Sequence, residues 1–368
     1  MAINQDDGRP EGQGQNEPDP AESTGQAHSA VQPDGGHFRG VLIALVLVAL
    51  TFIGGKLYLD WQDKAIAQQQ ILPGRQPSAP SFDLSQATIS PEKIRGGGPP
   101  KDGIPALTDP KLVKAGEARY LRPDDRVAGM VIDGEARAYP LRILTWHEIV
   151  NDEIQSQPIA MTYCPLCDSV AAFDRRTCDG VKEFGVSGLL YNSNVLMFDR
   201  DSQPEALWTQ IGSEAVSGPL ANQDLKSLPV ELTTWADWSE RHPETLVLSA
   251  QTGHPRDYNA NPYAGYFQQP GLMFPVEPTS DRLPEKEKVL GVRAPDGSSK
   301  AYPVSAFAKS NGPAEILDEV GGQPITIRYN PKASSLRVVN AGDDVEWMYS
   351  FWFAWYAFHP DTEIYSGP

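Results

Sequence analysis

From about residue 102 onward, short runs in which apolar and polar residues alternate follow one another, separated by turn residues. Alternation of this kind is typical of strands that bury one face. Residues 127–132 and 136–139 flank the pair Asp133-Gly134, and this pair favours a two-residue turn with positive φ. The segment therefore predicts a β-hairpin.

Other segments predict short helices and further strands. We expect a helix over residues 141–150, in which His147 shares an inward face with apolar neighbours, and a second helix over residues 234–242, which begins at threonines that can cap it. Residues 159–163 and 170–174 predict two strands on either side of a tight loop. The expected fold class is α+β, mostly antiparallel β with short helices.

The chain also resembles itself. The matching segments are Ala138-Tyr139-Pro140 with Ala301-Tyr302-Pro303, PIAMTYCPLCDSVAAF with PITIRYNPKASSLRVV, and Trp235, Trp238, His242, Pro243 and Thr245 with Trp352, Trp355, His359, Pro360 and Thr362. An internal duplication explains this pattern. It predicts one globular body over residues 102–368, with half one at 102–288, including an insertion at 175–233, and half two at 289–368.

The two copies differ where side chains could carry chemistry. The substituted pairs are Cys164 with Asn330, Cys167 with Ala333, and His147 with Ser310. Residues that both copies share are most simply scaffold, as for His242 and His359, whereas a set present in one copy requires another explanation. The leading hypothesis is therefore a functional site in half one.

Cys164-Pro165-Leu166-Cys167 is the sharpest local motif. Two thiolates at this spacing converge on one ion, and a Cys-Pro-x-Cys loop between strands resembles the metal knuckle of rubredoxins and zinc ribbons. Cys178 is the only other thiol of the sequence, so a site of four cysteines is excluded. Other side chains must complete the coordination of any metal.

His147 is the first candidate for a further ligand, although a lone inward imidazole is ordinarily a hydrogen-bonded core residue. Met197 is a candidate soft ligand, which would favour copper over zinc, and its ordinary interpretation is a core methionine. His254 is a weaker candidate. The hypothesis is a transition-metal site, copper or zinc, at Cys164, Cys167, His147 and Met197, with a redox, metal-handling or structural role.

Two alternatives remain open for the same sulfurs. One is thiol–disulfide exchange, although residues 168–174 alternate like a strand and so lack the helix that lowers the first thiol's pKa in thioredoxin-like proteins. The other is a non-enzymatic binding module, in which Cys164 and Cys167 form a structural disulfide. Neither a Ser/His/Asp order nor a phosphate-cradling glycine loop marks a reaction, so whether the chain is an enzyme stays open.

The segment before the body differs in composition. Residues 1–37 are acidic and poor in large apolar side chains, which predicts a disordered tail. Residues 38–59 contain the apolar run VLIALVLVALTFIGGKLYL, long enough to span a bilayer, and residues 60–101 are rich in Pro, Gly and Gln. We therefore expect a single-pass anchor in the cell membrane and a linker, with the body on the extracytoplasmic side.

Charge and cysteine content narrow the possible partners. The formal net charge is -17, so no basic stripe is available for phosphates and nucleic-acid binding is excluded. With 3 cysteines the chain is not a disulfide-stapled scaffold. The lipid bilayer, through residues 38–59, is the one partner that the sequence indicates.

Several strings of the sequence carry a resemblance to a known family: TYCPLCDSVAAF, GVSGLLYNSNVLMFDR, GIPAL, WHEIVND, LWTQIG, TTWADW, HPETLVLS and FWFAWYAFHPDT. Together they resemble a family of unknown function numbered 3179. The resemblance covers nearly everything from about residue 102 to the end. It identifies related proteins rather than a reaction. Cys178 lies outside the family pattern, as do the tail, anchor and linker.

Overall fold

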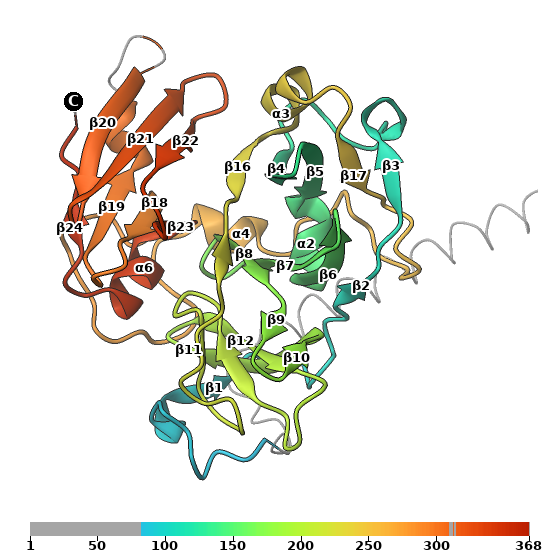
Figure 1. Cartoon of the computed structure of the whole chain (residues 1–368), viewed down its shortest axis with the longest axis vertical. Coiled ribbons are helices and arrows are strands. Elements are labelled where there is room, and N and C mark those ends of the chain that lie inside the picture. Colours follow the sequence, from blue (N-terminus) through green and yellow to red (C-terminus); the bar gives the residue numbers. More distant parts are fainter. Residues whose placement is uncertain (1–81, 309–311, 313, 368) are drawn as a thin grey trace, which may run out of the picture. The chain divides into compact units, whose positions relative to one another are not determined.

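A computed structural model describes residues 82–308, 312 and 314–367 (Figure 1). The expected tail at 1–37 and anchor at 38–59 lie outside these residues, as does Ser310, the counterpart of His147. Within the described part of the chain, no helix is both long and apolar enough to cross a bilayer. That part is mostly β, with predominantly antiparallel sheets and short helices, as the alternation predicts.

The predicted hairpin is present. Asp133 (φ 48°) and Gly134 (φ 82°) make a left-handed two-residue turn, whose twist matches that of the flanking strands. Val131 pairs with Ala136 across it. The hairpin forms the centre of a five-stranded sheet in the order β16 (Glu231–Thr234), β4 (Arg126–Ile132), β5 (Glu135–Pro140), β17 (Leu246–Leu248) and β3 (Leu112–Lys114).

A second hairpin with the same register lies in half two. Gly129 pairs with Ala138 in the first hairpin, and Gly291 pairs with Ala301 in the second. The second hairpin belongs to a nine-stranded sheet in the order β2 (Leu107–Thr108), β6 (Ile149–Ile154), β7 (Gln157–Cys164), β8 (Ser169–Asp174), β23 (Glu346–Phe351), β18 (Lys288–Arg293), β19 (Ser299–Pro303) and β24 (Glu363–Ile364), with β15 (Ser227–Leu228) beside β8.

Each half also has a three-stranded meander, β6–β7–β8 in half one and β20 (Ala314–Val320), β21 (Gln323–Asn330) and β22 (Ser335–Ala341) in half two. Each meander lies against the hairpin sheet of the other half. β8 pairs with β23 at Val170 and Tyr349, and β22 lies beside β16, where the hydroxyls of Ser335 and Thr233 are 3.2 Å apart. The strand edges of one half are thus covered by the other.

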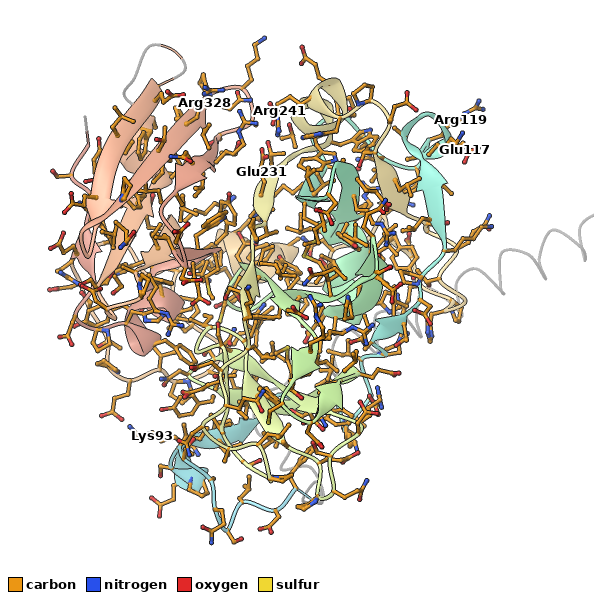
Figure 2. All side chains as sticks on the ribbon, viewed as in Figure 1. Lys93, Glu117, Arg119, Glu231, Arg241 and Arg328 are labelled. Atoms are coloured by element: carbon orange, nitrogen blue, oxygen red, sulfur yellow. The ribbon has the colours of Figure 1, made fainter. Side chains whose placement is uncertain are left out.

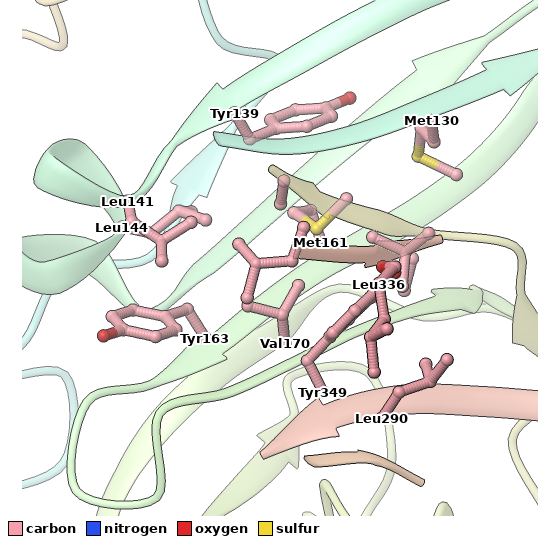
Figure 3. Close-up of a cluster of buried hydrophobic side chains, with 14 of the residues drawn as sticks. Met130, Tyr139, Leu141, Leu144, Met161, Tyr163, Val170, Leu290, Leu336 and Tyr349 are labelled. Carbon is pink, nitrogen blue, oxygen red and sulfur yellow. The ribbon is translucent and has the colours of Figure 1, made fainter. Parts of the chain in front are cut away.

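The main core is built from both halves. Figure 3 shows this cluster, in which residues of half one meet residues of half two: Met130, Tyr139, Met161, Tyr163 and Val170 with Leu290, Leu336 and Tyr349. The Tyr349 hydroxyl donates to the carbonyl of Leu336 at 2.8 Å, so this buried polar group is satisfied. Burial of shared apolar surface therefore joins the two halves.

The remaining strands lie in the insertion and in residues before 102. They form a sheet in the order β1 (Ile94–Gly96), β11 (Phe184–Tyr191), β12 (Asn194–Asp199), β13 (Leu207–Thr209) and β14 (Glu214–Ala215), and the hairpin of β9 (Arg176–Thr177) and β10 (Gly180–Val181). Phe82 is buried against Phe198. The expected linker boundary at residue 101 is therefore corrected, because residues 82–101 contain β1 and pack on the body.

The first predicted helix is shorter than expected. α2 (Leu141–His147) ends where Glu148 takes φ 58°, and Val150 already lies in β6, so the expected helix over 141–150 was too long. The second, α3 (Trp235–Arg241), starts at the predicted cap, where the amide of Asp237 donates to the Thr234 hydroxyl. The other helices are η1 (Pro91–Lys93), η2 (Ala115–Glu117), α4 (Ala264–Gln268), α5 (Val304–Phe307) and α6 (Trp352–Phe358).

Charged side chains lie mainly at the surface, often as ion pairs. Arg241 of α3 pairs with both Glu231 and Asp237, and Arg328 pairs with Glu315. Figure 2 labels three of these residues, Glu231, Arg241 and Arg328. The Arg241 pairs are partly buried, whereas the Arg328–Glu315 pair is exposed. Exposed pairs add little to stability, so we ascribe the fold mainly to apolar burial.

Candidate functional site

The Cys-Pro-Leu-Cys loop joins β7 to β8, as predicted. Cys164 is the last residue of β7, and the amide of Cys167 donates to the carbonyl of Cys164 at 3.2 Å, which closes a tight turn. Asp168 follows with φ 47°, a conformation that aspartate tolerates better than most residues. No helix follows Cys167, because residues from Ser169 onward form β8.

Both sulfurs are enclosed and share one acceptor. Cys164 is 1% exposed and Cys167 is 0% exposed. The Sγ atoms of Cys167 and Cys164 lie 3.2 Å and 3.9 Å from the carbonyl oxygen of Ser193, so both thiols can donate to it. Ser193 belongs to the Asn192-Ser193 turn between β11 and β12, whose two positive φ angles point this carbonyl inward.

The surroundings make the two thiols unequal. Burial by itself would raise the pKa of Cys164, but the Cys167 thiol and the backbone amides of Cys167, Val195 and Leu166 donate to its sulfur, and its pKa is lowered. Burial raises the pKa of Cys167 well above its usual range, and its contact with the Cys164 sulfur raises it further. Cys164 is therefore the more acidic thiol of the pair.

Glu148 is an acidic residue beside this pair that we did not single out from the sequence. Its side chain is buried at the end of α2, and burial raises its pKa well above the usual range, with a further contribution from the charge of Cys164. Burial raises the pKa of Tyr263 well above its usual range, and the charges of Glu148 and Cys164 raise it further. The only signal in the sequence was an acidic residue in the otherwise apolar stretch around WHEIV.

A buried polar network holds the loop to the β11–β12 turn. Ser169 donates to the Gln210 side-chain oxygen at 2.5 Å, the Asn194 amide donates to the same oxygen at 2.8 Å, and the Gln210 amide donates to Thr162 at 2.9 Å. Every one of these groups is buried and paired, so the network is stabilising. Gln210, within LWTQIG, gave no chemical signal in the sequence.

The segment around α4 covers the loop. The Tyr266 hydroxyl donates to the carbonyl of Leu166 at 3.0 Å, and the Ser193 hydroxyl donates to the carbonyl of Phe274 at 2.8 Å. Lys286 donates to the carbonyl of Tyr266 at 2.6 Å, which anchors the segment from its other side. We call residues 263–277 the covering segment. It shields the sulfurs from solvent.

The structure does not bring His147 into a ligand set with the cysteines. Its Nδ1 lies 2.7 Å from the carbonyl of Pro105 and its Nε2 lies 2.7 Å from the Tyr258 hydroxyl, so both ring nitrogens have partners. Across the described residues, no three or more His, Cys, Asp or Glu side chains are grouped as metal ligands. The expected Cys164, Cys167 and His147 centre is therefore not assembled, because α2 directs the imidazole toward Pro105 and Tyr258.

The other candidates have separate surroundings. Met197 is fully buried in β12 and belongs to the same apolar cluster as both cysteines. His254 is exposed, and its ring lies 5.2 Å from that of His147. Cys178 is exposed, with its thiol 3.0 Å from the Gln223 side-chain oxygen.

The two matched histidines pack as structural residues. His242 lies on Trp238 with ring centroids 4.2 Å apart, and His359 lies on Trp355 at 4.0 Å. Each follows the last residue of its helix, and its amide donates to the carbonyl of that tryptophan. Identical contacts in the two halves support leaving both outside the site.

Comparison with known proteins places the chain among relatives without an assigned activity. Residues 101–345 match the model of a family described as "Protein of unknown function (DUF3179)". No curated protein and no solved structure matches the chain. These comparisons therefore name no activity for the chain.

Proposed function

The chain belongs to the DUF3179 family, and we propose that its domain carries out reversible two-electron redox chemistry at Cys164 and Cys167. The observation that supports this most directly is the contact between two thiols of unequal acidity. A thiolate is the nucleophile in disulfide chemistry, and a neighbouring thiol resolves the intermediate. Both parts are present in one loop.

The amide donors supply what a helix supplies in thioredoxin-like proteins. There, the positive end of a helix lowers the pKa of the first thiol. Here three backbone amides, from Leu166, Cys167 and Val195, donate to the Cys164 sulfur. The missing helix, which weakened the redox hypothesis at the level of the sequence, is thus replaced by a turn and a strand.

The co-reactant that we propose is a small-molecule disulfide, RSSR. The Cys164 thiolate attacks one sulfur, the S–S bond of RSSR breaks, and one RS⁻ leaves with the electron pair. Cys167 loses its proton and attacks the Cys164 sulfur, which forms the Cys164–Cys167 disulfide and releases the second RS⁻. The products are one protein disulfide, one RSH that carries the proton of Cys167, and one RS⁻ that takes its proton from solvent, and both electrons pass from the protein to RSSR.

We assign to Glu148 the transfer of protons in this cycle. Burial and, second, the charge of Cys164 raise the pKa of its carboxyl well above the usual range, which favours the neutral form. A neutral acid at this place protonates the departing thiolate and later regains the proton from Cys167. The covering segment must move for RSSR to enter, since both sulfurs are enclosed.

A soft-metal centre was the leading hypothesis from the sequence. Amide donors to a thiolate occur in metal knuckles too, and two thiolates suit copper or zinc. Both nitrogens of His147 have hydrogen-bond partners, and Met197 packs in the apolar cluster that also contains the cysteines. We derive no chemistry through a metal.

Matched contacts in the two halves also support the proposal of an internal duplication. Tyr139 donates to Asp152 at 2.7 Å, and Tyr302 donates to Asp318 at 2.9 Å. The redox site then belongs to one copy, since Asn330 and Ala333 stand at the two cysteine positions of the other. If the body lies outside the cytoplasm, as the anchor at 38–59 predicts, the surroundings favour the disulfide form.

The test is titration of the full-length protein with reduced and oxidised glutathione, followed by acid quenching, alkylation and mass spectrometry. We expect Cys164 and Cys167 to lose their thiols together, with the loss of two hydrogen atoms, and to recover them on reduction. Cys178→Ser is the matched control and should titrate like the wild type. Cys164→Ser and Cys167→Ser should form no internal disulfide.

Two outcomes would contradict the proposal. In one, both thiols stay free at every glutathione ratio. In the other, purified wild type carries a stoichiometric metal that Cys164→Ser lacks, and this would restore the metal hypothesis.

Glu148→Gln should slow disulfide formation without preventing it, because the glutamine cannot donate a proton of the same acidity.

A further inference from the structure

A small pocket apart from the dithiol site lies where the two halves meet. It has a volume of about 90 Å³ and is lined by both halves, through Arg126, Asp168 and Thr233 on one side and Lys288, Ser334 and Ser350 on the other. That volume has room for several water molecules or for one small oxyanion. The dithiol chemistry does not use this pocket.

Two cations occupy matching places in the pocket. Arg126 precedes Val127, which pairs with Pro140, and Lys288 precedes Val289, which pairs with Pro303. The pocket therefore holds two positive side chains and one carboxylate, Asp168, in a chain whose net charge is -17. A local excess of positive charge in an acidic protein favours a negatively charged ligand.

The N–H donors of Arg126 and Lys288 in the pocket are only partly engaged in hydrogen bonds or ion pairs. One guanidinium nitrogen of Arg126 lies 2.7 Å from Asp168, whose carboxylate also accepts from Tyr163 at 3.0 Å. Among the described residues, Lys288 has no ion pair within 4.0 Å. Lys288 is exposed and lies at the rim of the pocket. Its pKa is lowered, first by the charge of Arg126, so an anion between the two cations would relieve a repulsion.

A buried hydroxyl gives a second, independent indication. Ser350 is 2% exposed, and its Oγ has no hydrogen-bond partner in the described part of the chain. The matching residue in half one, Thr233, donates to Asp237 at 2.9 Å. A buried hydroxyl without a partner costs free energy, which a ligand oxygen in the pocket would recover.

From these positions we infer that the pocket is a binding site for a small oxyanion, held by Arg126, Lys288 and the hydroxyl of Ser350. The ligand is a carboxylate or phosphate group of low charge, because the two cations exceed the one carboxylate by a single charge. This site is separate from the proposed redox reaction, so either can fail without the other.

The experiment is calorimetric titration of the full-length protein with sodium acetate and, separately, inorganic phosphate, at constant ionic strength. We expect saturable binding of at least one of them. Tighter binding of acetate identifies a carboxylate ligand, and tighter binding of phosphate identifies a phosphate-bearing one. Lys288→Met and Ser350→Ala should each weaken that binding about tenfold or more, as expected for a lost hydrogen bond to a charged group.

Two variants serve as controls. Lys288→Arg keeps the charge and should retain the binding. Lys226→Met removes an exposed lysine outside the pocket and should leave the binding unchanged. The inference is overturned if neither anion gives saturable heat, or if Lys288→Met and Ser350→Ala bind like the wild type while their circular dichroism shows them folded.

Discussion

The imidazole of His147 is held on both sides, and this decides its chemistry. Pro105 precedes it by 42 residues and Tyr258 follows it by 111, and each occupies one ring nitrogen. The Tyr258 hydroxyl in turn contacts Thr252. A histidine fixed in this way orders the segments that it joins, and both of its ring nitrogens are engaged in hydrogen bonds. Burial of the ring gives the residue a measurable pH signature.

Burial, as the largest influence, lowers the pKa of His147 from 6.5 to about 4. Between these values the unfolded chain binds the proton and the folded chain does not, so this contribution to stability is complete above pH 6.5 and is lost as the pH falls toward about 4. Urea unfolding at several pH values should show that His147→Gln loses less stability than the wild type over this range.

His147→Gln should also be less stable than the wild type at pH 7, by about 1–3 kcal/mol, because buried hydrogen bonds are lost. Burial lowers the pKa of His359 to about 3 and lowers that of His242, but both residues remain in the two proteins, so the difference isolates His147. Equal pH slopes in the two proteins would contradict the assignment.

At the scale of elements, each hairpin packs directly under a short helix. An added Cβ at Gly129 would lie 2.3 Å from the ring of Trp238, and one at Gly291 would lie 2.3 Å from the ring of Trp355. Each indole nitrogen donates at 3.0 Å to the threonine directly before the strand that follows, Thr245 before β17 or Thr362 before β24. Glycine is thus required by close approach, not by backbone conformation.

Gly129→Ala and Gly291→Ala should each lower the free energy of unfolding by about 1–3 kcal/mol, since a methyl group must displace an indole from a packed site. Gly116→Ala is the matched control, because nothing lies within 4 Å of its added Cβ. Denaturant unfolding followed by tryptophan fluorescence measures both effects. Unchanged stability in both variants would show that the helices shift freely over the sheets.

At the scale of the described residues of the body, stability depends on the packing of the strands of each half against those of the other half. The meander of each half lies against the hairpin sheet of the other, and one core cluster contains residues of both. A half without its partner would expose the edges of β8 or β22 and the apolar residues beneath them. Unpaired edges and exposed core favour aggregation over folding.

We therefore expect residues 82–288 and 289–368, expressed separately, to lack a cooperative unfolding transition, and to form one when they are co-expressed. Circular dichroism and thermal unfolding of each fragment and of the pair measure this. A fragment that unfolds cooperatively by itself would show that the halves are independent domains, and would remove the argument from shared burial.

Local patterns were sufficient for much of the fold. The hairpin at Asp133-Gly134, the strands on either side of the Cys164 loop and the Thr234 cap all follow from interactions within a few residues, and all are present. The position at which α2 ends was not predicted, because Glu148 adopts a left-handed conformation that is usually marked by a glycine in the sequence, and no glycine is present there. The place of residues 82–101 was also missed, since β1 is added to β11 from far along the chain.

The sequence by itself determined the β-rich class and the loop that carries two thiols, because alternation, turn residues and spacing act over short distances. Only the tertiary structure decided which groups meet. It brought the Ser193 carbonyl and Glu148 to the sulfurs, gave His147 other partners, and set Arg126 opposite Lys288. Hydrogen bonding, burial and charge depend on distances in space, and residues far apart in the chain supply them.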